Sequence, residues 1–143
     1  MIERRMGHII NVGSLGSLIG LPSTTAYSAS KFGVAGLSEA LWGEVLRFNI
    51  AVTLVCPHAM KTNMLSNTKS YSPAKEGADE YWAKVIEKAM NPDIAAQSIL
   101  KAAEKKRFMV LLGKESFIMY NMKRICPNTF MKIMAKIISR ITD

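Results

Sequence analysis

The chain contains the stretch GHIINVGS at residues 7–14, an apolar run that ends in small residues. Such a run predicts a buried parallel strand over residues 8–14. A helix is predicted from about Thr25 to Phe48, because apolar side chains recur there at steps of three and four. These side chains are Val34, Leu37, Leu41, Val45 and Phe48. A β-branched run at residues 50–56 predicts a second buried strand, which completes a right-handed strand–helix–strand unit.

The rest of the chain continues this alternation of helices and strands. A helix is predicted to begin at Asn91, because Asn91 suits an N-cap and Pro92 suits the first helical position. Its inward side chains are predicted to be Ala95, Ala96, Ile99, Leu100 and Ala103. The predicted elements after residue 56 are a loop at 57–75, helices at 79–90 and 91–106, a strand at 108–112, and helices at 114–125 and 129–141. The pattern predicts a single α/β domain over residues 1–143.

Composition excludes several classes of protein. The 143 residues are 49% hydrophobic, which is enough apolar material for one core. Cys56 and Cys126 form no C-x-x-C pair, and His8 and His58 stand apart from other ligand types, so we expect neither a disulfide scaffold nor a metal site. The start of the chain does not resemble a signal peptide, and no run of about 18 apolar residues is present to span a bilayer. We therefore expect a cytoplasmic protein.

Positive charge is concentrated at the end of the chain. The formal net charge is +8, and residues 101–143 hold ten Lys and Arg against three Asp and Glu. The cations lie among regularly spaced apolar residues rather than in one run, which is typical of the solvated face of a helix. No nucleic-acid-binding motif accompanies them, so we expect no nucleic-acid partner.

Three polar residues follow the first strand at informative spacings. Tyr27 and Lys31 are four residues apart at the start of the predicted helix, and Ser14 ends the preceding strand. Helical residues at i and i+4 share a face, so the Lys31 ammonium can lie beside the Tyr27 phenol. A neighbouring cation favours the ionised phenol, which a free tyrosine reaches only near pH ~10. Such a tyrosine can transfer protons in catalysis.

The same tyrosine-to-cation spacing occurs twice elsewhere in the chain. Tyr71 precedes Lys75, but Pro73 lies between them and disfavours a regular helix. Tyr120 precedes Arg124, in a segment with no strand and serine before it. The spacing alone is therefore weak, and the preceding strand and serine distinguish the copy at Tyr27.

Four stretches together resemble the short-chain dehydrogenase/reductase family. They are GHIINVGS at residues 7–14, GLP at 20–22, YSASKF at 27–32 and VCPHAMKT at 55–62. The resemblance covers residues 1–65 well and the remainder loosely. It implies an NAD(P)-dependent oxidoreductase that transfers a hydride between nicotinamide and a carbonyl or alcohol substrate.

The resemblance also implies a role for individual residues. Tyr27 would transfer the proton, Ser14 would hydrogen-bond the substrate oxygen, and Lys31 would act on Tyr27 and bind the nicotinamide ribose. Pro57 and Thr62 would hold the carboxamide of NAD or NADP. His58 departs from the family pattern, because a glycine is usual at its position.

The dinucleotide-binding start of the family fold is absent from the sequence. Gly13, Gly16 and Gly20 do not have the spacing of the phosphate-binding fingerprint and are interpreted as a flexible loop beneath the site. The chain therefore resembles a carboxy-terminal half. The fold class predicted is a partial Rossmann-like doubly wound parallel sheet of about three strands with flanking helices, lacking the N-terminal dinucleotide-binding βαβ units. Its regions are the active-site and nicotinamide region at 1–65, the substrate loop, helix and last strand at 66–113, and the basic amphipathic helices at 114–143.

Two functions follow as hypotheses. The first is the oxidoreductase, with little activity from the isolated chain, a homo-oligomer in its full-length form, and a small carbonyl or alcohol substrate. Ten methionines, five of them from Met109 onward, favour a deformable apolar pocket and a lipophilic substrate. The second is a non-catalytic binding module whose basic tail docks on an anionic membrane or a protein partner. The choice between NAD and NADP and the reaction direction stay open.

Overall fold

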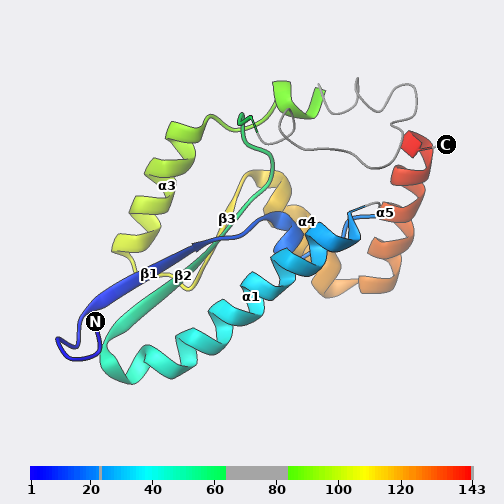
Figure 1. Ribbon diagram of the computed structural model, residues 1–143. Helices are drawn as coiled ribbons and strands as arrows, with labels where there is room; N and C mark the ends of the chain where they lie inside the picture. Colours follow the sequence, from blue (N-terminus) through cyan, green and yellow to red (C-terminus); the bar gives the residue numbers. More distant parts are fainter. Residues whose placement is uncertain (23, 64–83, 143) are drawn as a thin grey trace.

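The structure is a computed structural model, and it describes residues 1–22, 24–63 and 84–142. Within these residues a parallel sheet of three strands has the order β1-β2-β3. The strands are β1 (Gly7–Val12), β2 (Ile50–Pro57) and β3 (Met109–Leu112). In the register, Val12 pairs with Val55, and Pro57 pairs with Leu112. The predicted parallel α/β sheet with flanking helices is confirmed, and Figure 1 shows the strands running side by side.

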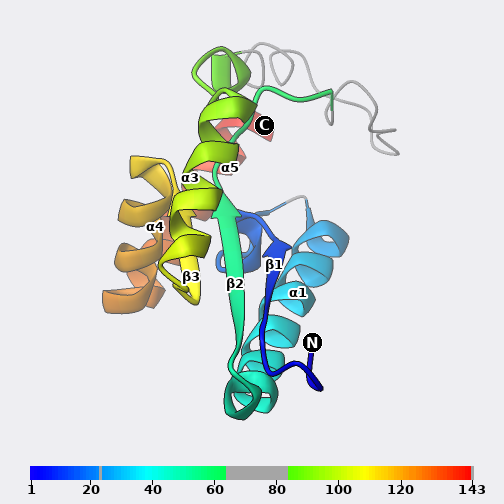
Figure 2. The ribbon, with the colours of Figure 1, turned by 90° about the vertical axis from the view of Figure 1, so that its left-hand side faces the viewer.

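Helices cover both faces of this sheet. On one face α1 (Thr25–Val45), continued by the 3-10 turn η2 (Leu46–Phe48), places Ala35 against Leu54 and Cys56 of β2. On the other face α3 (Pro92–Glu104) places Ala95 against Val55. Adjacent strand residues point to opposite faces, so α1 and α3 lie on opposite sides of β2, as Figure 2 shows.

Small residues as well as larger ones form the inward face of α1. The buried positions of α1 are Ser28, Ala35, Ser38 and Val45. Leu37, predicted to lie in the buried stripe, is 61% exposed, so that part of the prediction is wrong. The Ser38 hydroxyl accepts a hydrogen bond from the Asn11 side chain of β1 at 2.9 Å. Small side chains let the helix approach the sheet closely, while Val34 and Leu41 of the predicted stripe pack against buried residues from partly buried positions.

The start of α3 agrees with the prediction, and its buried face agrees in part. The Asn91 side chain accepts a hydrogen bond from the Asp93 backbone at 2.7 Å, and Pro92 opens the helix. Ala95 is buried as predicted, whereas Leu100 is 62% exposed. The second buried alanine is Ala102, one position before the predicted Ala103.

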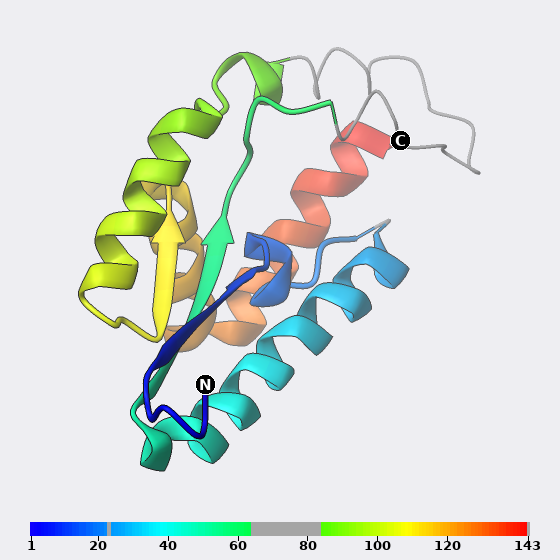
Figure 3. The same ribbon diagram turned by 60° about the vertical axis from the view of Figure 1, so that its left-hand side comes forward.

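The chain ends in two helices, α4 (Lys114–Ile125) and α5 (Pro127–Thr142), joined at Cys126. They pack against the segment that follows β1, which contains the 3-10 turn η1 (Leu15–Ser17). Phe130 and Met134 of α5 form one buried cluster with Leu15 and Ile19, and Met119 of α4 packs on it. Figure 3 shows α5 rising behind this turn. Two of the five methionines from Met109 onward therefore belong to this internal cluster.

The segment between β2 and α3 is described only at its ends. Of the predicted helix at 79–90, residues 79–83 lie outside the described residues, and helical structure covers 84–87. Met60 and Met90 form an isolated parallel bridge that holds the two ends of the segment together. Among the helices of the described residues, none combines the length and the apolar character needed to cross a membrane.

Candidate active site

Ser14 lies just beyond the carboxyl end of β1, in a tightly hydrogen-bonded turn. The Gly13 amide donates to the Val55 carbonyl at 2.8 Å and continues the ladder between β1 and β2. The Ser14 hydroxyl accepts from the Gly16 amide, and the Ser14 amide donates to the Ser17 hydroxyl, both at 3.1 Å. This reciprocal pair is a capping box, which fixes the Ser14 side chain at the start of η1. The glycine-rich segment, interpreted as a flexible loop, is instead a closely packed turn.

Gly16 lies between the serine and the tyrosine. A methyl group added at Gly16 would lie 2.9 Å from Tyr27 Cε1 and 3.5 Å from Ser14 Oγ. Both side chains therefore border the same backbone position, although 13 residues separate them in sequence. The close approach of the Tyr27 ring is the physical reason for a glycine here. The structure thus brings together two of the three predicted catalytic residues.

Lys31 lies one helical turn beyond Tyr27 on α1. Its Nζ atom is 5.8 Å from the centroid of the Tyr27 ring, and both side chains are half-buried. The ammonium is therefore close enough for an attractive electrostatic contact with the ring and with negative charge on its oxygen. The turn of α1 that carries Tyr27 is held by Ser28, whose hydroxyl accepts from the Leu21 amide at 3.3 Å.

The segment after β2 holds the predicted cofactor residues. Pro57 is buried at the end of β2, and the His58 amide donates to the Leu112 carbonyl at 3.2 Å. Thr62 is exposed. The backbone before it is fixed by the Lys61 amide, which donates to the Met90 carbonyl at 3.0 Å. The structure thus places Pro57 at the carboxyl end of β2 and Thr62 beyond that end.

Two residues near the site were not predicted. Cys56 is fully buried behind Ser14, and burial raises the pKa of its thiol to about 11, opposed by a hydrogen bond from the Ser14 backbone. Lys123 of α4 donates a hydrogen bond to the Leu18 carbonyl, and its Nζ lies 5.0 Å from the Phe32 ring centroid. Burial lowers the pKa of Lys123. No local sequence pattern could indicate the contact of Lys123, because 105 residues separate it from Leu18.

The tyrosine–cation pair at Tyr120 and Arg124 does not share this setting. Arg124 donates a hydrogen bond to the Tyr120 hydroxyl at 3.1 Å, on the exposed side of α4. The pair at Tyr71 and Lys75 lies outside the described residues. The described residues contain no group of three or more His, Cys, Asp or Glu that could hold a metal ion.

Known proteins resemble this chain in sequence. A family model described as short chain dehydrogenase matches residues 1–91. A Drosophila melanogaster protein named dehydrogenase/reductase SDR family protein 7-like is 32% identical over 138 residues, which cover 95% of this chain and 41% of that protein. The chain therefore spans less than half the length of this relative.

Solved structures of short-chain dehydrogenases are similar to this chain in fold. A short-chain dehydrogenase from Streptomyces avermitilis superposes with a TM-score of 0.73 at 29% identity, covering 100% of this chain and 55% of the other. One from Burkholderia cenocepacia, crystallised in complex with NADP, superposes with a TM-score of 0.73 at 20% identity, covering 93% of this chain and 49% of the other. The three strands and their helices thus correspond to about half of a Rossmann-type domain.

Proposed function

Because this chain belongs to the short-chain dehydrogenase family, we propose that it carries the Ser14–Tyr27–Lys31 site of an NAD(P)-dependent oxidoreductase. The reaction is hydride transfer between nicotinamide and the carbon of a carbonyl or alcohol. The observation that carries this proposal is the convergence of Ser14 and Tyr27 on Gly16, at the carboxyl end of β1. Ligands of open α/β sheets bind at this end of the strands.

The three side chains divide the proton chemistry between them. In reduction, the Tyr27 hydroxyl gives its proton to the substrate oxygen, and in oxidation the phenolate removes the proton from the alcohol. The Ser14 hydroxyl donates a hydrogen bond to the same oxygen as negative charge develops there. It can do so while its own oxygen accepts from the Gly16 amide, because a hydroxyl has one donor and two acceptor positions. Lys31 stabilises the negative charge on the phenol oxygen.

The residues at the strand ends fit the nicotinamide half of a dinucleotide. Bound NAD(P)H would supply the hydride for the reaction. Lys31 would hold the ribose hydroxyls, and Pro57 and Thr62 would hold the carboxamide from the end of β2. The pyrophosphate has no glycine-rich turn in this sequence to receive it. We therefore propose that the described residues bind only part of the cofactor.

The free edge of β1 supports an incomplete domain. Within the described residues β1 is an edge strand, and its side chains Ile10 and Val12 are 36% and 51% exposed. Ile10 pairs with Thr53, which lies on the same face of the sheet as Val55, and α3 packs on Val55. Ile10 and Val12 therefore project on the α3 face, where α3 covers β2 and β3 but not β1. An open edge with exposed apolar side chains is a surface on which a further strand can pair. We propose that additional strands beside β1 complete the cofactor site.

Titration calorimetry with NADH and NADPH tests the incomplete site. The isolated chain is expected to bind both weakly, and micromolar binding to a monomer would contradict this part of the proposal. Fusion of the amino-terminal half of the Streptomyces avermitilis relative ahead of residue 1 is expected to raise the affinity for a nicotinamide cofactor.

Single substitutions in that fusion test the catalytic roles. Tyr27→Phe is expected to abolish carbonyl reduction while cofactor binding is retained. Tyr120→Phe is the matched control, because Tyr120 also has a cation four residues later but belongs to α4, where its hydroxyl accepts an exposed hydrogen bond from Arg124. Equal activities in the two variants would remove Tyr27 from the mechanism.

The binding-module hypothesis depends on the apolar face of α5. Phe130 and Met134, two residues of that face, are 3% and 9% exposed and pack inside the chain. Ile133 and Ile137 stay partly exposed, at 41% and 43%. The oxidoreductase is therefore the function that we propose, and co-sedimentation with anionic vesicles at low and high salt would test the alternative.

A further inference from the structure

The outward face of α4 is apolar. The large apolar side chains exposed on this helix are Phe117 (62%), Ile118 (54%), Met122 (45%) and Ile125 (76%). Ile118, Met122 and Ile125 recur at steps of four and three, so they lie along one face of the helix, and Phe117 borders that face. Single exposed apolar residues are ordinary on a protein surface, whereas a row of them along one helix indicates an interaction surface.

The inward face of α4 holds the helix to the rest of the chain. Ser116 is fully buried, and Met119 packs on the buried cluster that α5 forms with the turn after β1. Lys123 donates a hydrogen bond to the Leu18 carbonyl. Ser116, Met119 and Lys123 recur at steps of three and four, so they form a separate face, directed into the chain. The exposed row therefore lies on the outside of a helix that is already packed.

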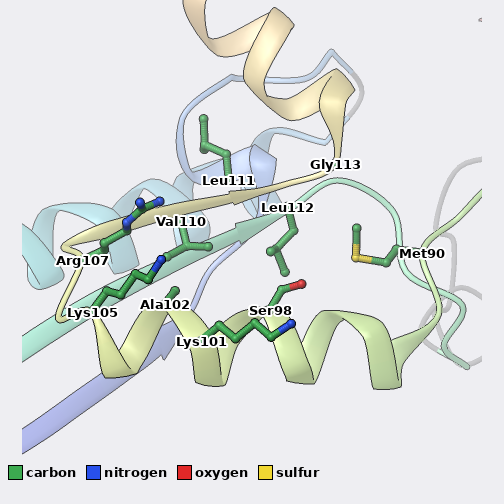
Figure 4. A pocket seen from close by; sticks show the side chains of 10 residues that line it. All are labelled: Met90, Ser98, Lys101, Ala102, Lys105, Arg107, Val110, Leu111, Leu112 and Gly113. Atoms are coloured by element: carbon green, nitrogen blue, oxygen red, sulfur yellow. The ribbon is translucent and has the colours of Figure 1, made fainter.

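The strands proposed to complete the sheet lie at the edge away from α4. They are proposed to pair with β1, whereas α4 follows β3 at the other edge and contacts it. Figure 2 shows α4 next to β3 and away from β1. Figure 4 shows α4 leaving Gly113 on one side of β3, with α3 on the other side. The apolar face of α4 is therefore open to a different partner.

Cations flank the apolar row. Lys114 precedes Ile118 by four residues and Arg124 follows Phe117 by seven, so both of these exposed cations lie beside the row. Residues 114–142 hold six Lys and Arg against one Asp or Glu. A second copy of the chain on this face would bring like charges together, because symmetric pairing places a surface against itself. An anionic lipid surface has the complementary charge, and long cationic side chains can reach its headgroups while their stems cover apolar surface.

We propose that the outward face of α4 docks on an anionic lipid bilayer. The helix lies in the plane of the membrane surface, with its four exposed apolar side chains at the boundary between headgroups and acyl chains. Lys114 and Arg124 lie among the headgroups. At 12 residues α4 is too short to span a bilayer, so the docking is peripheral. The proposal concerns α4, whereas the binding-module hypothesis above depends on α5, and it does not depend on the oxidoreductase activity.

Co-sedimentation of the 143-residue chain with vesicles tests the docking. One set of vesicles is phosphatidylcholine alone, and the other contains about 30% phosphatidylserine, which makes the surface negative. Binding to the second set is expected to exceed binding to the first and to weaken as salt increases. Equal binding to the two sets, or no binding to the phosphatidylserine vesicles at low salt, would overturn the proposal.

Two double variants test the face of α4 itself. Ile118→Ser with Ile125→Ser removes apolar surface, and Lys114→Gln with Arg124→Gln removes the flanking charge. Each pair is expected to lower the vesicle partition coefficient about tenfold, because a surface helix binds through both its apolar area and its attraction to anionic lipid.

Matched controls lie on α3, which covers the opposite face of the sheet from α1. Ile94→Ser with Leu100→Ser changes residues that are 55% and 62% exposed. Lys101→Gln with Lys105→Gln removes two charges from exposed positions, which are labelled in Figure 4. Less than about a twofold change is expected in either control, since these residues lie outside the docking face. Equal losses from α3 and α4 would show general attraction to the +8 chain and overturn the proposal.

Sedimentation velocity without vesicles tests a second copy as the occupant. The Ile118→Ser, Ile125→Ser variant is expected to sediment like the unchanged chain. A dimer that this variant dissociates would assign the face to a second copy and overturn the proposal. Circular dichroism of each variant establishes that the fold is retained.

Discussion

The Lys123 ammonium donates a hydrogen bond to the Leu18 carbonyl, and this contact joins α4 to the segment that carries Ser14. The same ammonium lies 5.0 Å from the Phe32 ring centroid, next to Lys31 on α1. Three parts of the chain thus meet at one side chain. The terminal helices stabilise the turn after β1 through this contact as well as through the apolar cluster around Phe130.

Lys123→Met should destabilise the chain. The substitution keeps the aliphatic stem but leaves the Leu18 carbonyl without its donor, so the free energy of unfolding is expected to fall by about 1–2 kcal/mol. Urea denaturation measures this change. Lys132→Met, at an exposed position of α5, is the control and should change the free energy by less than about 0.5 kcal/mol. Similar losses in both variants would remove the role given to the Lys123 contact.

Gly16→Ala should disturb the site directly. The new methyl group would lie 2.9 Å from Tyr27 Cε1, so the ring has to move, and a loss of about 1–3 kcal/mol in unfolding free energy is expected. Gly36→Ala on α1 is the control, because a methyl group there meets nothing within 4 Å. It should stabilise the chain by about 0.5–1 kcal/mol, since alanine is the better helix former. Urea denaturation measures whether each substitution lowers or raises the free energy of unfolding. Stabilisation by Gly16→Ala would contradict the close approach of the Tyr27 ring to Gly16.

The order of elements could be predicted from the sequence, and the buried face of α1 could be predicted in part. Apolar runs and the Asn91–Pro92 start are local signals, because strand patterning and helix capping involve residues that are near one another in the chain. The predicted stripe is right at Val45 and wrong at Leu37, because the small residues Ala35 and Ser38 face the sheet in its place. Apolar periodicity cannot register such a contact.

The same limit explains which parts of the site were missed. The proximity of Ser14 and Tyr27 could be predicted because a strand, a serine and a helix follow one another in sequence. The contact that brings Lys123 to Leu18 spans 105 residues and leaves no local pattern. The role of Gly16 depends on the Tyr27 ring beside it, which only the three-dimensional arrangement reveals.

The Cys56 thiol should make the chain less stable at high pH. Burial raises its pKa from 9.0 to about 11 in the folded chain, so above pH 9 the unfolded chain loses the thiol proton first. The folded chain then binds more protons than the unfolded chain, and the free energy of unfolding falls between pH 9 and about 11. The fall from this group is at most about 3 kcal/mol.

Urea denaturation across this pH range measures the effect. In Cys56→Ala this component of the pH dependence should disappear, whereas Cys126→Ala, at an exposed thiol, should retain it. The comparison uses the slope of the unfolding free energy against pH. A loss of stability that is the same at every pH, caused by the smaller alanine side chain at position 56, therefore does not affect it. Parallel slopes in the two variants would contradict the assignment to Cys56.

Val12→Lys should reduce self-association of the isolated chain. Val12 is 51% exposed on β1, and an open edge strand with apolar side chains pairs readily with another copy. A lysine at an edge opposes such pairing through charge repulsion, and at so exposed a position it costs little stability. Leu46→Lys is the control, because Leu46 is 55% exposed but lies at the end of α1, in η2. Sedimentation velocity should show smaller species for Val12→Lys alone. Because the β1 edge is where the missing strands are proposed to pair, equal effects in both variants would place self-association elsewhere and weaken the case for an incomplete sheet.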